Sequence, residues 1–239
     1  MKRNYLSASA LKAFAKSPNH YLEYIAQTYE PTPAMQLGTL IHCLLLEPYE
    51  FERRYAIMPE VDRRTKAGKE EWLQFSAEHD HLEMVKRETF DDASNCVAVA
   101  TMDPILSSIL TEPNHVEEEL EGDLFGFPFK ARIDLETEEY VYDVKTTQDA
   151  SPEAFMRQAH NLDYHLQAAV YRLMTGKVFR WIAIETKAPY NVAVYQQSEI
   201  AFARSSARLK QLVRDFIAWD GKPKSYSTEI LTLDLPRWA

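Results

Sequence analysis

The segment ARIDLETEEYVYDVKTTQD, residues 131–149, combines acids and a lysine in a spacing that suits a metal site. Asp134 and Asp143 stand nine positions apart, and Lys145 follows Asp143 by two. Side chains two apart on a β-strand point to the same face, so Asp143 and Lys145 should project together. A tight turn between two strands would bring Asp134 to the same place. Two carboxylates, the Val144 carbonyl and waters form a set of oxygen ligands that suits Mg²⁺, with Mn²⁺ as a substitute.

A metal ion at that place can activate a water molecule and neutralise negative charge on a phosphodiester. Lys145 would then orient the attacking water or stabilise the pentavalent phosphorus. The alternative is a surface hairpin with a solvated ion pair, and the spacing alone leaves both open. Acid-x-Lys is frequent in a chain with 36 acidic residues, but only Asp143 follows a predicted hairpin whose other strand presents an acid; the pattern also occurs at Glu185-Thr-Lys187 and Asp220-Gly-Lys222.

Three further groups of residues could add to this site. Tyr164, Gln167 and Tyr171 fall at i, i+3 and i+7, so they share one face of a helix. This face is either simply exposed or a polar stripe that contacts a DNA backbone. His42 lies in an apolar helix and is either a satisfied core histidine or a metal ligand. One of the three glutamates at 117–119 would complete a carboxylate set if it faced inward, and otherwise they form a charged strand.

The composition is that of an ordinary globular protein, with 239 residues of which 46% are hydrophobic and 26% charged. A formal net charge of -9 argues against a simple basic DNA-coating protein, but leaves room for a nucleic-acid enzyme with a local positive surface. The chain has 6 glycines and neither GxGxxG nor GxxxxGK[ST], which argues against a Gly-rich phosphate cradle. With 2 cysteines and no CxxC, we expect no disulfide framework, zinc site or iron–sulfur cluster.

Positive charge is concentrated in a polar stretch between residues 50 and 70. The candidates for DNA binding in this stretch, with a solvated charge run as the alternative, are Arg53, Arg54, Arg63, Arg64 and Lys66. The N-terminus shows no secretory apolar region, and no run approaches the roughly 18 apolar residues of a membrane span. We therefore expect a soluble, cytoplasmic protein without membrane contact.

The elements that must position these residues follow from hydrophobic periodicity and capping signals. Helices are expected over 6–16 and 18–25, over 35–47 up to Pro48, over 67–80, in one or two pieces over 82–110, over 152–176 and over 198–221. Strands are expected in three pieces over 115–147, with turns near Gly122-Asp123, Gly126 and 137–139, and as a hairpin over 178–187 and 190–198. Neither a repeat nor a low-complexity linker occurs, so we expect one domain over 1–239, mainly helical over 1–110 and carrying the sheet and catalytic core over 111–239.

The order Gly-Thr-x-x-His, Glu, Asp, Asp-x-Lys and Gln-x-x-x-Tyr resembles the PD-(D/E)xK nuclease superfamily in its RecB-like branch. Within that branch the chain is similar to RecE-type exonucleases, the nuclease domain of exonuclease VIII, over about residues 6–239. Ile133 replaces the proline of the strict motif, which leaves the ligating Asp134 in place. The resemblance rests on five separated blocks in the same order: LGTLIHCLLLEPYEF, RRTKAGKEEW, ARIDLE with VYDVKTT, YHLQAAVY and the terminal LPRWA.

This resemblance implies an α/β, restriction-endonuclease-like core with a small mixed sheet flanked by helices. It implies a Mg²⁺-dependent exonuclease that degrades one strand of linear duplex DNA from its 5′ end, as a nuclease core without the long N-terminal extension of its relatives. The residues that match the catalytic pattern are His42, Asp134, Asp143, Lys145, Gln167 and Tyr171, with the Val144 carbonyl and Glu117 as further metal ligands and Tyr164 beside the DNA; for the glutamate, the register among 117–119 stays open.

The resemblance also implies partners. These are double-stranded DNA ends, a RecT-like single-strand annealing protein and further copies of the chain in a ring-shaped homo-oligomer lined by basic residues. Two other functions remain open on the same core. One is a structure-specific or restriction-type endonuclease, for which no base-reading insert is evident. The other is a DNA-end-binding protein that does not cut, which would be expected to have lost Asp143 or Lys145.

Overall fold

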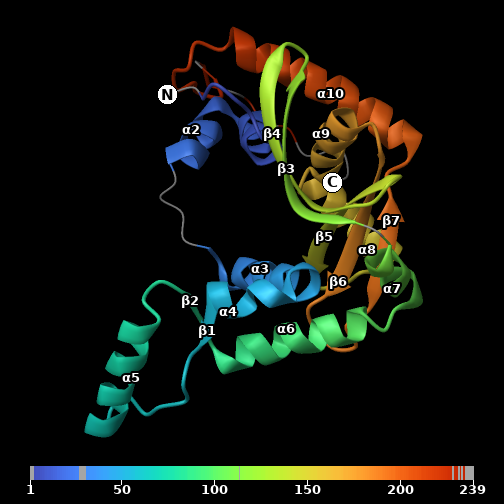
Figure 1. Ribbon diagram of the computed structural model, residues 1–239. Helices are drawn as coiled ribbons and strands as arrows, with labels where there is room; N and C mark the ends of the chain where they lie inside the picture. Colours follow the sequence, from blue (N-terminus) through green and yellow to red (C-terminus); the bar gives the residue numbers. More distant parts are fainter. Residues whose placement is uncertain are drawn as a thin grey trace.

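The protein is described by a computed structural model that covers residues 3–26, 31–112, 114–227, 229–230, 232 and 234. It is a mixed α/β molecule in which helices lie on both faces of a five-stranded sheet (Figure 1). The predicted fold class, a small mixed sheet flanked by helices, is confirmed. The block LPRWA, residues 235–239, lies outside the described residues.

The sheet has the order β3-β4-β5-β6-β7, and its neighbours are antiparallel except for the parallel pair β5–β6. All five strands predicted from the sequence are present: β3 (His115–Leu124), β4 (Phe127–Glu136), β5 (Tyr140–Thr147), β6 (Val178–Glu185) and β7 (Val192–Gln196). The first turn lies at Phe125 and Gly126, which both have positive φ, while Gly122 and Asp123 are paired inside β3. The turn is thus shorter than the sequence suggested, because the two residues Phe125 and Gly126, both with positive φ, reverse the chain.

Alternating side chains along β5 feed two hydrophobic cores. Val141 packs into one core, with β6 residues and the helices α1 (Ala8–Lys16), α2 (Pro18–Ala26), α8 (Pro152–Asn161), α9 (Tyr164–Thr175) and α10 (Glu199–Ala218). Tyr142 and Val144 pack into the other, with α3 (Pro33–Leu46), α6 (Arg87–Ala100) and α7 (Pro104–Thr111). This strand is therefore covered on both sides, which fits the parallel pairing of β5 with β6.

The single helix expected over 152–176 is wrong, because the chain breaks between α8 and α9. Asp163 adopts left-handed backbone angles, φ 53 and ψ 38, just before Tyr164. Aspartate tolerates this region better than most residues, and the Asp163 carboxylate is held by the Arg208 guanidinium of α10 through two hydrogen bonds. The break redirects the chain so that α8 and α9 each present a glutamine toward β5, Gln158 and Gln167.

A smaller unit projects from the body of the molecule at the lower left of Figure 1. It begins with a short 3₁₀ turn (Pro48–Glu50) and α4 (Phe51–Arg54), and its two short strands pair in parallel: β1 (Tyr55–Ile57) and β2 (Glu83–Val85). Between these strands lies α5 (Lys66–Glu78), which buries only Gly68. The sequence predicted the helix over 67–80, but it did not show β2, because a strand of three residues has no readable period.

One observation concerns membranes. No single helix in the described part of the chain is long and apolar enough to cross a bilayer. Helices α6 and α7 meet that test only as a pair, and the pair is bent by 90°.

Candidate active site

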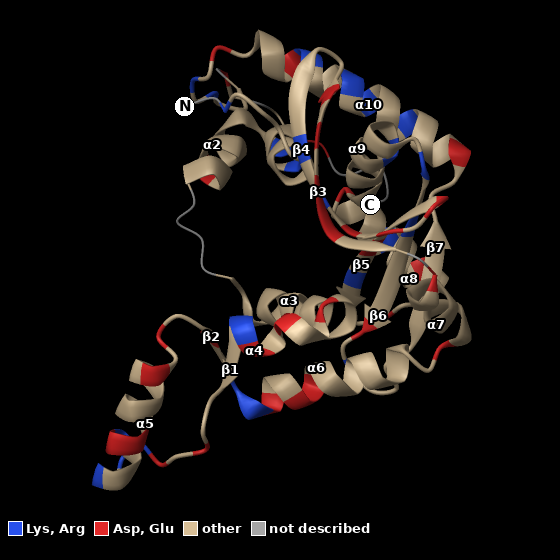
Figure 2. Cartoon of the chain, viewed as in Figure 1, with Lys and Arg blue, Asp and Glu red and all other residues tan. Residues whose placement is uncertain are grey.

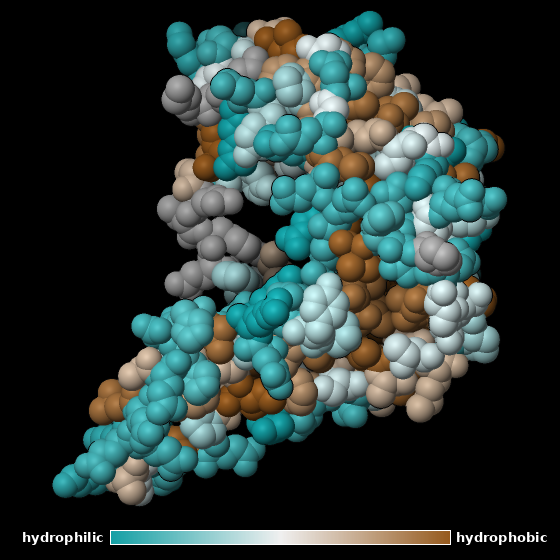
Figure 3. All heavy atoms as spheres, viewed as in Figure 1, coloured by the Kyte–Doolittle hydropathy of each residue, from teal (hydrophilic) through white to brown (hydrophobic). Residues whose placement is uncertain are grey.

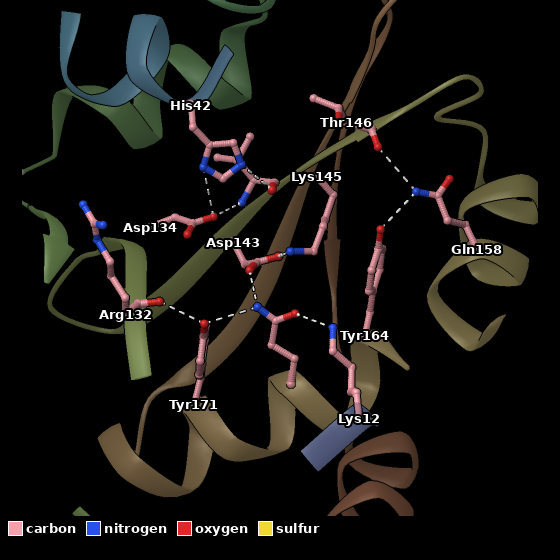
Figure 4. A network of polar contacts seen from close by, with 12 residues as sticks. Lys12, His42, Arg132, Asp134, Asp143, Lys145, Thr146, Gln158, Tyr164 and Tyr171 are labelled. Atoms are coloured by element: carbon pink, nitrogen blue, oxygen red, sulfur yellow. Dashed lines mark hydrogen bonds and ion pairs between the residues drawn. The ribbon is translucent and has the colours of Figure 1, made fainter. Parts of the chain in front are cut away.

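A cleft of about 620 Å³ opens where α3 faces the sheet across β3, β4 and β5. The space-filling view shows the surface hollowed between the two halves of the molecule (Figure 3). Residues from distant parts of the sequence line this cleft, and they include His42, Glu117, Asp134, Lys145 and Tyr164. The structure therefore gathers the sequence-predicted residues of five different elements at one place (Figure 4).

His42 reaches the site because α3 approaches β5 closely. A Cβ built on Gly38 would lie 3.2 Å from Thr146 Oγ1, so a larger residue there would require Thr146 or the helix to shift. His42 Nε2 donates to the Val144 carbonyl over 2.9 Å, and its Nδ1 lies 3.6 Å from Asp134 Oδ2. Burial lowers the pKa of His42, which favours the neutral ring. A neutral ring that donates through Nε2 carries a lone pair on Nδ1, directed to the acidic side of the cleft.

Glu117 is the glutamate that faces the site. It lies opposite Asp134 in the β3–β4 pair, between the partners Val116–Leu135 and Glu118–Ile133. Its backbone has φ 53, and its side chain is 15% exposed, whereas that of Glu118 is 45% exposed. The sequence left open which of the glutamates 117–119 faces the site. In the structure it is Glu117, the residue with the positive φ.

The two acids that lie near His42, Asp134 and Glu117, are in an environment that favours the binding of a cation. Burial and the nearby Asp143 raise the pKa of Asp134 to about 7, and burial with Asp134 raises the pKa of Glu117. Ligand atoms of His42, Glu117 and Asp134 all lie within 4.8 Å of one another. Metal–oxygen distances of about 2.0 to 2.6 Å place the ligands of one divalent ion about 3 to 5 Å apart, so this donor set could hold one such ion. A divalent cation would relieve the repulsion that raises both pKa values.

Asp143 and Lys145 project from the same face of β5, as the period of two predicted. Lys145 Nζ lies 2.5 Å from Asp143 Oδ2, and Asp143 is 1% exposed. This Oδ2 accepts no hydrogen bond of good geometry among the described residues, so the contact with Lys145 is an ion pair. Burial by itself would lower the pKa of Lys145, but Asp143 and Asp134 reverse this and hold the pKa above its ordinary value.

Val144 uses both of its backbone groups at the site. Its N–H donates to Asp134 Oδ2 over 2.7 Å, and its carbonyl accepts from His42. A carbonyl oxygen has two lone pairs, so one remains for a metal ion. Asp143 and Val144 adjoin the His42–Glu117–Asp134 group without belonging to it in this structure, and their role as metal ligands stays a prediction.

The face of α9 that carries Tyr164, Gln167 and Tyr171 is turned inward. Gln167 Nε2 donates to Asp143 Oδ1 over 2.8 Å and to the Tyr171 hydroxyl over 3.2 Å, and that hydroxyl donates to the Arg132 carbonyl over 2.9 Å. Tyr164 and Tyr171 are 8% and 6% exposed. An exposed stripe on this helix is therefore wrong, because its polar groups are used to hold β4 and β5. Of these three residues, only Tyr164 lines the cleft, and the centre of its ring lies 5.0 Å from Lys145 Nζ.

The basic residues predicted to bind DNA lie partly on α4 and partly at or just before the start of α5, and Figure 2 shows Lys and Arg spread over many elements. Arg54 lines the cleft and pairs with Glu47 over 2.8 Å, while Arg53 pairs with Glu50 over 2.8 Å. The other three residues lie further along the projecting unit, between β1 and β2. There Arg64 pairs with Asp62, Lys66 lies 3.9 Å from Glu70, and Arg63 stacks on Trp72. Their part in DNA binding stays a prediction, which Arg54 supports by its place in the cleft.

Three residues at the site were missed by sequence reasoning. Arg132 pairs with Glu117 over 2.7 Å, and its position two before Asp134 on one strand face could have indicated it. Gln158 donates to the Tyr164 hydroxyl over 3.2 Å, and Lys12 of α1 approaches Gln167 Oε1 at 3.4 Å. Nothing in the local sequence marks these two, because their partners belong to other elements.

Comparison with known proteins shows the family and the fold of this chain. The model of a protein family described as "PDDEXK-like domain of unknown function (DUF3799)" matches residues 7–225. A crystal structure of a "Putative exonuclease" from Eubacterium rectale has a TM-score of 0.62 at 14% sequence identity, and the match covers 90% of this chain and 80% of that one.

A second solved structure, SSO0001, has a TM-score of 0.34 at 14% identity, with 81% of this chain and 91% of that chain covered, and this likeness is too low to support an argument. None of the curated proteins matches the sequence. The Eubacterium protein shares the fold of this chain, and the family match covers both the acidic hairpin and the helix that bears His42. The chain therefore belongs to the PDDEXK-like domain family and has the fold of the PD-(D/E)xK nuclease superfamily.

Proposed function

We propose that this protein is a metal-dependent 5′–3′ exodeoxyribonuclease that acts on linear double-stranded DNA and leaves 3′ single-stranded tails. The observation that carries the proposal is the ion pair between Lys145 and Asp143, placed beside the His42–Glu117–Asp134 group in one cleft. A structural ion pair would need only one carboxylate. Two further acids, Asp134 and Glu117, have raised pKa values, and this indicates a site that is built to receive a cation.

The reaction is hydrolysis of a phosphodiester, in which water adds to phosphorus and one P–O ester bond breaks. A divalent ion held by His42, Glu117 and Asp134, Mg²⁺ or Mn²⁺, would lower the pKa of a bound water and neutralise charge on the phosphate. Lys145 presents an ammonium group to the reacting phosphate and stabilises the negative charge that develops there. Gln167 keeps Asp143 in place by donating to its Oδ1, so that Oδ2 remains available beside Lys145.

The exonuclease activity, its polarity and its biological setting rest on similarity. The likeness to RecE-type exonucleases supports degradation from the 5′ end, delivery of single strands to a RecT-like annealing protein and assembly into a ring-shaped homo-oligomer. The description of the Eubacterium protein as an exonuclease points the same way. A ring would also explain how a chain with a formal net charge of -9 retains DNA, since subunits could turn Arg54 and its neighbours toward a shared channel.

The proposal is tested with linear duplex DNA labelled at the 5′ or the 3′ end, with a covalently closed circle alongside, in Mg²⁺ or EDTA. We expect Mg²⁺-dependent loss of the 5′ label from the linear substrate only. Lys145→Ala should lower the rate about 100-fold or more, the size of effect seen when one electrostatic donor is removed. Lys222→Ala is the matched control, because Lys222 follows Asp220 by two but both side chains are exposed.

Other outcomes would change the assignment. Cutting of the closed circle would favour the alternative hypothesis, in which a protein with this fold is an endonuclease. Absence of cutting by folded protein in either Mg²⁺ or Mn²⁺ would refute the nuclease proposal and leave a non-cutting DNA-end-binding protein as the remaining function.

A further inference from the structure

Lys12 is the residue of the first helix that reaches the catalytic cluster. Its Nζ lies 3.4 Å from Gln167 Oε1 and 5.7 Å from the centre of the Tyr164 ring (Figure 4). The ring of Tyr164 thus has two ammonium groups near it, since Lys145 lies 5.0 Å away. Burial and the charge of Lys145 lower the pKa of Lys12 to about 8, so the group is still mostly protonated at neutral pH.

A series of hydrogen bonds runs from Lys12 through Gln167 to Tyr171, and the ammonium group of Lys12 determines which atom donates in each of them. An ammonium group only donates, so Gln167 must turn its Oε1 toward Lys12. The same amide then turns Nε2 toward Asp143 Oδ1 and the Tyr171 hydroxyl. The hydroxyl, having accepted, donates onward to the Arg132 carbonyl. Lys12 therefore favours the orientation in which this amide donates to Asp143 of β5 and to the Tyr171 hydroxyl.

The opposite orientation of the Gln167 amide would harm the site. It would place Oε1 against the Asp143 carboxylate, an acceptor against an acceptor, and leave Asp143 with no donor from α9. Asp143 is 1% exposed, so water would not replace that hydrogen bond readily. Without Lys12, the choice between the two orientations would rest on Tyr171 and Asp143 alone.

The first helix is held firmly enough for Lys12 to do this. Ser7 caps it by accepting from the Ala10 N–H, and the preceding residue, Leu6, exchanges backbone hydrogen bonds with β4, donating to Pro128 and accepting from Lys130. Phe14 packs edge-on against Phe216 of α10 at a ring separation of 5.1 Å. Lys12 is thus presented by a helix whose two ends are tied to different elements.

We propose that Lys12 is a positioning residue of the active site, which acts through the Gln167 amide to hold the Asp143 carboxylate in place for hydrolysis. The catalytic part of this inference rests on the proposed nuclease function. The structural part, in which Lys12 sets the Gln167 amide, does not.

The structural part is tested by NMR of side-chain amide groups, without substrate or metal. The Gln167 signals are assigned by their loss in Gln167→Met. We expect these signals to shift in Lys12→Met and to return near their original position in Lys12→Arg, because a guanidinium also only donates. Lys16→Met is the matched control, since Lys16 is an exposed lysine one turn along the same helix and should leave the signals unmoved.

The catalytic part is tested by a double-mutant cycle in kcat and KM. Lys12→Met and Gln167→Met should each lower kcat about tenfold with little change in KM, and the double variant should be no slower than Gln167→Met alone. Lys12→Arg should recover most of the rate. A residue with only a structural role would lower the thermal midpoint, and its effect would multiply with that of Gln167→Met.

The proposal fails if Lys12→Met leaves the Gln167 amide signals in place, or if the two kcat losses multiply. A wild-type protein that does not cut DNA would count against the proposed function, and the amide signals would still decide whether Lys12 sets Gln167.

Discussion

Lys145 Nζ and Asp143 Oδ2 lie 2.5 Å apart on one face of β5, and Asp143 is almost completely withdrawn from solvent. Burying two charges together costs solvation free energy that their attraction only partly offsets. A hydrophobic pair at these positions would suit the sheet equally well. We therefore infer that the pair is kept for its part in a reactive site. Substitution of one or both residues should measure the coupling of the two charges and their effect on stability.

Removal of one partner should destabilise the protein more than removal of both. Lys145→Met leaves a buried carboxylate without its cation, and we expect the free energy of unfolding to fall by about 3 to 5 kcal/mol. The double variant Asp143→Asn/Lys145→Met should recover most of that loss. Urea unfolding in EDTA measures both, with Lys222→Met as the exposed control. A double variant as unstable as Lys145→Met would show that the two charges are not coupled.

The metal-free protein should lose stability as the pH rises through the range in which Asp134 ionises. The pKa of Asp134 is raised to about 7 in the folded protein from an ordinary value of 3.8. The folded state therefore binds more protons than the unfolded state between these values, so stability present at pH 4 is lost progressively as the pH rises to about 7. The expected loss is on the order of 4 kcal/mol.

Urea titrations of the wild type and of Asp134→Asn at several pH values, all in EDTA, measure this effect. The substituted side chain does not ionise, so its stability curve should be flatter over the same range. Equal slopes in the two proteins would show that Asp134 does not titrate there.

Metal binding should depend on Glu117 and not on its neighbour. Glu117→Gln weakens one donor of the group formed with His42 and Asp134, and we expect the affinity for Mn²⁺ to fall at least about tenfold. Glu118→Gln makes the same chemical change at the next position, where the side chain is 45% exposed, and should have little effect. Calorimetric titration with Mn²⁺ gives both affinities, and similar losses in the two variants would contradict this assignment of Glu117.

The close approach of α3 to β5 at Gly38 should be sensitive to one methyl group. Gly38→Ala adds helix propensity, but its Cβ would lie 3.2 Å from Thr146 Oγ1 and move His42 away from the acids. We expect lower stability and weaker Mn²⁺ binding. In a Thr146→Ala background the same substitution meets no hydroxyl and should stabilise the protein by about 0.5 to 1 kcal/mol. Thermal unfolding of the four proteins separates the two effects, and an equal change in both backgrounds would exclude the contact as the cause.

Much of the site could be predicted because it depends on local periodicity. The period of two along a strand places Asp143 and Lys145 on one face, and the short turn after β4 brings Asp134 to them. Helical spacing likewise placed Gln167 and Tyr171 on one face of α9. These relations involve residues within one element or one hairpin, so the sequence pattern contains them.

The remainder depends on relations that no local pattern contains. The break at Asp163 has neither glycine nor proline, and it is held by Arg208 from a helix much later in the chain. Glu117 was ambiguous because three glutamates follow one another and the irregular φ at the first of them decides the side it faces. Lys12 was missed because its partner Gln167 lies 155 positions away.

The long separations within the cluster also set an order of events during synthesis. His42 meets Val144 across 102 positions, and Lys12 meets Gln167 across 155. Contacts between residues so far apart form late in folding, and not before both partners exist. A nascent chain interrupted before α9 lacks Gln167 and Tyr171 altogether, while its acids and His42 are already made. The cluster that would cut DNA is thus completed only after α9 has left the ribosome, which keeps chains that stop before α9 from carrying an assembled site.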